Sequence, residues 1–126
     1  MPAALQALFE DASGVRVQAL PCELEGVGSK AVHFSAGART RPHRHTGGQH
    51  IVVVSGTGVV ADEQTLRIVR PGDVVASLPS GWHWHGALPG AAMSHVTVEA
   101  PGLDLDVEQR DWADVYTDRL DTEASQ

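Results

Sequence analysis

Residues 37–56 read GARTRPHRHTGGQHIVVVSG, and this stretch carries the pattern that decides the fold. Side chains two residues apart on a strand point to the same side, so His43 and His45 can face one cavity. A double glycine then marks a turn, and Gln49 opens a second strand whose apolar residues at 51 and 53 share its parity. The stretch therefore predicts two strands that direct two imidazoles and a carboxamide inward.

Short strand-like runs, separated by glycine and proline, extend from this stretch over most of the chain. The 126 residues include 13 glycines and 7 prolines, and only 5% of the side chains are aromatic. Alternation begins at Val15, and no span between 14 and 100 keeps a helical period. Closely spaced turn signals predict an all-β sandwich or barrel, with strands over 28–34, 42–46, 49–55, 58–61, 65–70, 73–78, 82–86 and 93–99.

The length and an apolar content of 42% predict one domain with a single core. We expect residues 1–13 to form an N-terminal arm with a short helix, and residues 14–103 to form the barrel. Residues 104–126 carry eight acidic and two basic side chains, so most of the net charge of −7 belongs to this tail. The tail is predicted to lay a short strand or helix across the barrel and then fray. In the arm, one helical face would hold Leu5, Leu8 and Phe9.

All seven histidines lie between His33 and His95. A second His-x-His pair, His83 and His85, shares one parity, and His95 shares its parity with Glu99 on the predicted strand 93–99. Imidazole suits zinc, copper, iron and nickel, and also manganese when oxygen ligands join it. One His-x-His pair is as often a surface or packing feature, but two pairs and a further strand histidine favour a metal site.

Two segments resemble the motifs of a known family. Residues 37–56 resemble the first cupin motif, G-x5-H-x-H-x3-E-x6-G, at every spacing, and residues 72–83, GDVVASLPSGWH, resemble the second, G-x5-P-x-G-x2-H, more loosely. In the second segment Leu78 and Ser80 stand where proline and glycine are usual. The resemblance covers about residues 28–100. It implies a cupin double-stranded β-helix, a jelly-roll barrel, that holds a divalent metal through His43, His45, Gln49 and His83.

The segments PHRHTGGQHIVVVSGTG, RPGDVV and HWHGALPGAAMSHVTV are similar to a subgroup of small cupins. Its best-known members are manganese-dependent bacterial hydroxynitrile lyases. The resemblance implies manganese, with iron, nickel and zinc as alternatives, and it implies that His85 and His95 line the pocket. Gln49 replaces the usual glutamate, so a metal here would keep about two positive charges instead of about one. Such a site favours anionic ligands.

Three further residues are candidates for the substrate pocket, with ordinary core or surface roles as the alternative: Arg41, Val32 and Met93. His50 has the opposite parity to Gln49 and is expected to face outward, and His33 is expected to be structural. The apolar residues of the outer faces predict that a second subunit covers a sheet, which gives a homodimer or larger homo-oligomer. These residues are Val52, Val54, Trp82, Trp84, Val96 and Val98.

Three functions remain open at this point. The first is a metal-dependent lyase that acts on a small α-hydroxy compound such as a cyanohydrin, with the metal as Lewis acid and His95, or else His85, as base. The second is a cupin dioxygenase that uses iron or another redox metal. The third is a binding module that holds metal and a small molecule without turnover.

Composition narrows the partners and the compartment. A net charge of −7 argues against nucleic acid or an anionic membrane as partner, so a small molecule is the expected ligand. No apolar run approaches the roughly 18 residues of a membrane span. The single cysteine, Cys22, excludes an internal disulfide framework and a cysteine-based zinc finger. The start, MPAALQALFED, lacks the basic n-region of a secretory signal, so a cytoplasmic location is expected.

Overall fold

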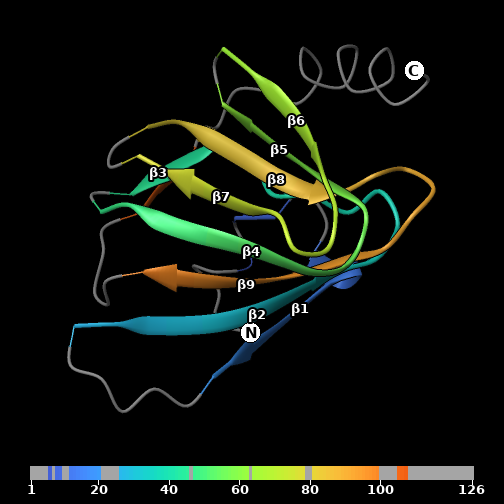
Figure 1. Cartoon of the computed structure of the whole chain (residues 1–126), viewed down its shortest axis with the longest axis horizontal. Coiled ribbons are helices and arrows are strands. Elements are labelled where there is room, and N and C mark those ends of the chain that lie inside the picture. Colours follow the sequence, from blue (N-terminus) through green and yellow to red (C-terminus); the bar gives the residue numbers. More distant parts are fainter. Residues whose placement is uncertain are drawn as a thin grey trace.

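The computed structural model describes residues 6, 8–9, 12–20, 26–45, 47–62, 64–78 and 81–99, and the backbone of 105–107. Figure 1 shows two sheets that face each other across a common core. In chain order the elements are a 3-10 turn η1 (Ala12–Gly14) and the strands β1 (Val15–Ala19), β2 (Gly28–Phe34), β3 (His43–His45), β4 (Gln49–Gly56), β5 (Gly58–Asp62), β6 (Leu66–Val69), β7 (Val74–Ser77), β8 (His83–Ala87), β9 (Met93–Glu99) and β10 (Leu105–Val107).

The two sheets are antiparallel and each has five strands, in the orders β1-β2-β9-β4-β7 and β10-β3-β8-β5-β6. All strands predicted between residues 28 and 99 are present, and their ends differ from the predicted ones by at most one residue. The all-β prediction is therefore confirmed. Consecutive strands often lie in different sheets, so strands far apart in the chain become neighbours. For example, β9 pairs with β2 on one side and with β4 on the other.

The core fills the space between the inner faces of the two sheets. Alternation places Ile51 and Val53 of β4 inward, where they are at most 1% exposed. Val60 of β5 and Phe34 of β2 belong to the same cluster, so the core joins both sheets. Burying a side chain of this size stabilises the fold by about 1.5–3 kcal/mol, and this apolar lining fixes which face of each strand points inward.

Two glycines permit close approaches that a side chain would block. Gly56, the last glycine of the first motif, has a φ of 74°, and a Cβ there would collide with the Ala92 carbonyl. Gly86 follows His85 on β8, and a Cβ on it would collide with the Ala38 carbonyl. Because Gly86 has no side chain, Arg39 can form a β-bridge with it, and this bridge brings the 38–40 segment against β8.

The ends of the chain add to the barrel where the structure describes them. Leu8 and Phe9 are buried in the core, and Phe9 forms an antiparallel bridge with Thr40. Gln6 is helical, whereas Leu8 lies in a turn and Phe9 pairs as a strand, so the predicted helix does not extend through Phe9. Leu5 lies outside the described residues. A short strand or helix was predicted across the barrel, and the described part of the tail is the strand β10, which pairs with β3. The rest of the acidic tail lies outside the described residues.

The outer faces of the two sheets differ. On the second sheet Trp84 is 1% exposed and packs in a cluster with Val59, Ala61 and Leu66. The expectation that Trp84 contributes to an open apolar face is therefore wrong, because its own chain already buries it. On the first sheet Val54 and Val98 remain 51% and 37% exposed.

Candidate metal centre

Three histidines converge on one point inside the barrel. His43 and His45 lie on the same face of β3, and His83 of β8 pairs directly with His43. One ligand atom from each of the three lies within 4.8 Å of the others, and all three side chains are buried. Ring centroids are 4.4 Å apart for His43 and His83 and 5.2 Å apart for His45 and His83. These three histidines could therefore hold a divalent metal ion.

Hydrogen bonds at Nδ1 orient the rings of all three histidines. A carbonyl oxygen only accepts, so Nδ1 of His43 must donate to the Arg41 carbonyl (2.8 Å), and Nδ1 of His45 must donate to that of Gly47. A neutral imidazole that donates through Nδ1 carries a lone pair on Nε2. Nδ1 of His83 contacts the Ser77 hydroxyl at 3.0 Å, and its buried Nε2 has no partner among the described residues. This combination of an oriented ring and an open nitrogen fits a metal ligand.

Gln49 adds an oxygen to the same point. Its Oε1 lies 3.0 Å from Nε2 of His45. Because Nδ1 of His45 already donates to Gly47, a neutral ring would set a lone pair against a carbonyl oxygen. Only a positive charge between the two atoms, a proton or a metal ion, makes the contact favourable. With the His43 and His83 nitrogens within 4.8 Å, a metal ion suits the geometry of all the donors.

Burial keeps His43 and His83 neutral. Desolvation lowers the pKa of His43 to about 4 and that of His83 to about 2, and the neighbouring histidines lower both further. The hydrogen bond to the Arg41 carbonyl opposes part of this shift at His43. A metal ion requires unprotonated imidazole, so His43 and His83 are ready to bind one near pH 7 without first losing protons.

A charged pair lies directly behind Gln49. Nε2 of Gln49 donates to Oε2 of Glu99 at 3.1 Å, and Oε1 of Glu99 lies 3.3 Å from Nζ of Lys30. The residues come from three adjacent strands, since Glu99 pairs in register with Gln49 on one side and with Gly28 on the other. The expected ligand set contains no carboxylate, but the Glu99 carboxylate contacts the side chain of Gln49, so the surroundings are less cationic than the sequence implied.

His85 and His95 lie next to the three histidines. The ring of His85 is 5.4 Å from that of His43, and its Nδ1 is 3.1 Å from Nε2 of His95. His95 is fully buried, and its Nδ1 has no partner within the described part of the chain. Desolvation lowers the pKa of His95 to about 4 and that of His85 well below its usual value. Both rings are therefore neutral near pH 7.

The remaining candidates occupy ordinary positions in the barrel. Val32 and Met93 are buried members of the core cluster, and Val32 pairs in register with His95. The Arg41 carbonyl orients His43, while a role for its side chain stays a prediction. His33 contacts the Ser94 hydroxyl at 2.7 Å, which suits a structural role, and His50 is exposed.

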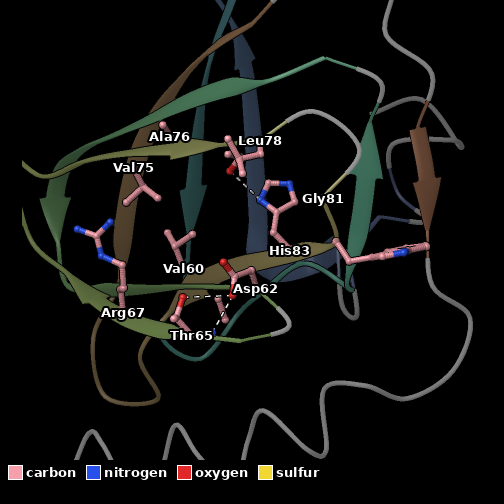
Figure 2. A pocket seen from close by; sticks show the side chains of 12 residues that line it. Val60, Asp62, Thr65, Arg67, Val75, Ala76, Leu78, Gly81 and His83 are labelled. Carbon is pink, nitrogen blue, oxygen red and sulfur yellow. Dashed lines mark hydrogen bonds between the residues drawn. The ribbon is translucent and has the colours of Figure 1, made fainter.

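Two cavities reach the site. One of about 240 Å³ opens between the β5–β6 hairpin and β7 and extends to His83. Figure 2 shows His83 and Arg67 on opposite sides of this cavity, with Val60 between them. Arg67 pairs with Val60 and so stands on the inner face of the edge strand β6. The other cavity, of about 360 Å³, is bordered by Gln49 and Glu99.

Three residues of the site were missed by sequence reasoning: Ser77, Glu99 and Arg67. Strand register places Glu99 and Arg67, and Gln49 and Glu99 are 50 positions apart. Ser77 lies on β7 of the other sheet and reaches His83 across the barrel. The shared parity of Glu99 with His95 was the one available signal, since it predicts an inward-facing carboxylate.

The chain is a double-sheet barrel with a possible metal site made by three histidines of β3 and β8. A family model assigns the barrel to a known class. The model described as "Cupin domain" matches residues 30–98, more than half of the chain. The chain belongs to the cupin family.

Individual relatives agree with this assignment. The chain is 39% identical over 93 residues to an (R)-mandelonitrile lyase of Granulicella tundricola, which covers 73% of this chain and 69% of the relative. It resembles the solved structure of a cupin-like protein from Thermotoga maritima (TM-score 0.68, 30% identity, 77% and 79% of the two chains). It also resembles a cupin 2 conserved barrel domain protein from Rhodopseudomonas palustris (TM-score 0.74, 21% identity, 97% and 83%), which supports the fold alone.

The described residues contain no helix long and apolar enough to cross a membrane. The cytoplasmic location stays a prediction.

Proposed function

We propose that this cupin is a metal-dependent lyase that cleaves a small α-hydroxy compound such as a cyanohydrin. The observation that carries the proposal is the His85–His95 pair, held 3.1 Å apart beside the three-histidine site. A site that only stores metal does not need two more buried imidazoles. Similarity to a relative described as an (R)-mandelonitrile lyase supports the same reaction class.

The ligand atoms would be Oε1 of Gln49 and Nε2 of the three histidines, His43, His45 and His83. A divalent metal held there, manganese by preference, would supply Lewis-acid catalysis that lowers the pKa of an α-hydroxyl. Oxygen and imidazole ligands together suit manganese, while iron, nickel and zinc remain alternatives.

Proton transfer falls to the neutral histidines in this scheme. His95, with His85 as the second candidate, takes the hydroxyl proton, and the electrons of that O–H bond form the carbonyl of an aldehyde. The carbon–carbon bond breaks and its electron pair leaves with cyanide, which then takes the proton back from the imidazolium. Because burial lowers the pKa of His95 to about 4, the protonated ring is a strong acid that returns its proton readily.

The cavity beside His83 suits a small, partly apolar substrate. Its walls include the side chains of Val60 and Val75, and its volume is about 240 Å³. Arg67 adds one cation on the inner face of β6. We therefore expect an aromatic or branched aldehyde fragment to be accepted, and an acidic group on its far end to be favoured.

Cleavage of mandelonitrile by the Mn(II)-loaded protein tests the proposal, with benzaldehyde release followed by absorbance. We expect turnover that falls at least about 100-fold in His95→Ala. The exposed His50→Ala is the matched control and should keep full activity. If His95→Ala cleaves as fast as the unaltered protein, His95 is not the base. Oxygen uptake that requires Fe(II) would instead establish a dioxygenase, and tight ligand binding without any product would establish a binding module.

We also propose that a second copy of the chain covers the outer face of the first sheet. Val74 and Val98 are 54% and 37% exposed there, and the in-register row Ala31, Val96, Val52 and Val74 crosses four strands. An apolar stripe of this kind can meet its own copy about a two-fold axis. A light-scattering mass of one chain would refute the proposed homodimer.

A further inference from the structure

The Glu99 carboxylate stands behind Gln49 and is not needed to complete the proposed ligand set. It accepts from Nε2 of Gln49 at 3.1 Å, and its other oxygen lies 3.3 Å from Nζ of Lys30. Its side chain is 19% exposed, so it is partly shielded from water. A partly shielded carboxylate is costly unless it is paired, and Lys30 and Gln49 both pair with this one.

The contact with Glu99 decides which end of the Gln49 amide faces the histidines. A carboxylate only accepts hydrogen bonds, so the NH2 group of the amide must face Glu99. The carbonyl Oε1 is then the atom directed at Nε2 of His45, 3.0 Å away. The opposite amide orientation would set Oε1 against the carboxylate and point NH2 hydrogens at the binding point, where they would repel a cation.

From these contacts we infer that Glu99 is a positioning residue for a metal ion. It orients Gln49 as an oxygen ligand, and from its place next to Gln49 it supplies negative charge that the Gln49 amide lacks. The inference rests on the proposed metal site. It explains how a neutral amide can stand where the related motif has glutamate. Residues that orient metal ligands in this way change metal affinity by about 10–100-fold.

Substitutions at 49 and 99 separate orientation from charge. In Glu99→Gln the new amide can still accept from Gln49 but carries no charge, so Mn(II) affinity should fall about tenfold. Glu99→Ala removes both contributions and should weaken binding further. In Gln49→Glu the ligand itself becomes a carboxylate beside Glu99, and the two repel. A carboxylate at position 49 offers an oxygen in either orientation, so in that background Glu99→Gln should weaken Mn(II) binding by less than it does in the original one.

The experiment measures Mn(II) dissociation constants by electron paramagnetic resonance of the free ion for all four combinations at 49 and 99. A smaller effect of Glu99→Gln in the Gln49→Glu background than in the original one supports the inference, and equal effects or no effect in both overturn it. Asp73→Asn is the matched control, because it removes one charge at the other end of β7 while its amide can still accept from Arg70 N. It should leave the dissociation constant within about twofold.

Two further outcomes keep the test decisive. If Gln49→Glu does not fold, as judged by circular dichroism, the Gln and Ala variants of Glu99 decide in the original background. Weaker binding in the order Glu, Gln, Ala supports the inference, and equal affinities overturn it. If the unaltered protein does not bind Mn(II), the proposed metal function itself fails, which is a result distinct from failure at Glu99.

Discussion

Acidification of the metal-free protein should unfold it, because its buried histidines resist protonation. The pKa of His43 and that of His95 are lowered by desolvation from 6.5 to about 4, whereas the unfolded chain returns them to about 6.5. Below pH 6.5 the unfolded state therefore binds more protons. Stability is fully present above this value and is lost as the pH falls toward 4.

The size of the loss follows from these pKa values. Each of the two histidines lowers the free energy of unfolding by about 2 kcal/mol between pH 7.5 and pH 5, so the pair removes about 4 kcal/mol. His83 and His85, whose pKa values are also lowered, add to this loss. Domains of this size are stable by about 5–15 kcal/mol, so the metal-free protein should approach its unfolding midpoint near pH 5.

Urea unfolding in EDTA, followed by tryptophan fluorescence at several pH values between 7.5 and 5, measures the effect. Trp84 is 1% exposed and should report the transition. Near pH 5 the slope of stability against pH should correspond to an uptake of about four protons, one for each shifted histidine. His95→Gln should reduce this number by about one, and His50→Gln should not. An uptake of one proton or fewer would refute the assignment of these rings as buried and neutral.

Three other outcomes follow from the geometry. His83→Ala should reduce Mn(II) affinity at least about 100-fold in calorimetry, because it removes a ligand atom from the buried group, whereas the exposed His50→Ala should not change it. Arg67→Gln should raise KM about fivefold for a carboxylate-bearing cyanohydrin but not for mandelonitrile, as steady-state kinetics would detect. Val98→Asp should convert the proposed dimer to a monomer in sedimentation velocity runs, since it places a charge on the 37% exposed apolar face.

The strands and the inward faces could be predicted from the sequence because both depend on local patterns. Alternation and turn residues placed β2 and β9 with the correct ends, and the parity of His43 and His45 predicted their shared face. The end of the helix in the N-terminal arm was predicted less well. Leu8 and Phe9 stand three and four residues after Leu5, which is helical spacing. Burial in the core and the pairing of Phe9 with Thr40 nevertheless decide their structure. Tertiary contacts of this kind override local propensity.

The contacts around the site could not be predicted, because they depend on register between distant strands. Gln49 meets Glu99 only because β4 pairs with β9, and Arg67 faces the cavity only because it pairs with the inward Val60. A shift of one residue in either pairing would turn these side chains to the other face. The sequence shows which residues can face inward, while the register decides which of them touch.

The Glu99 carboxylate contacts Gln49 and is not itself one of the proposed metal ligands, which has a chemical consequence for the proposed reaction. A glutamate ligand would neutralise about half the charge of a divalent metal at contact distance, whereas Glu99 acts through Gln49 and shares its charge with Lys30. Coulomb energy falls with separation, so more positive charge remains to stabilise an anion such as departing cyanide. The same carboxylate still orients the amide. An oxygen ligand in a fixed orientation and a cationic centre are thus compatible here, because Glu99 orients the amide and, acting through Gln49 and paired with Lys30, offsets only part of the charge.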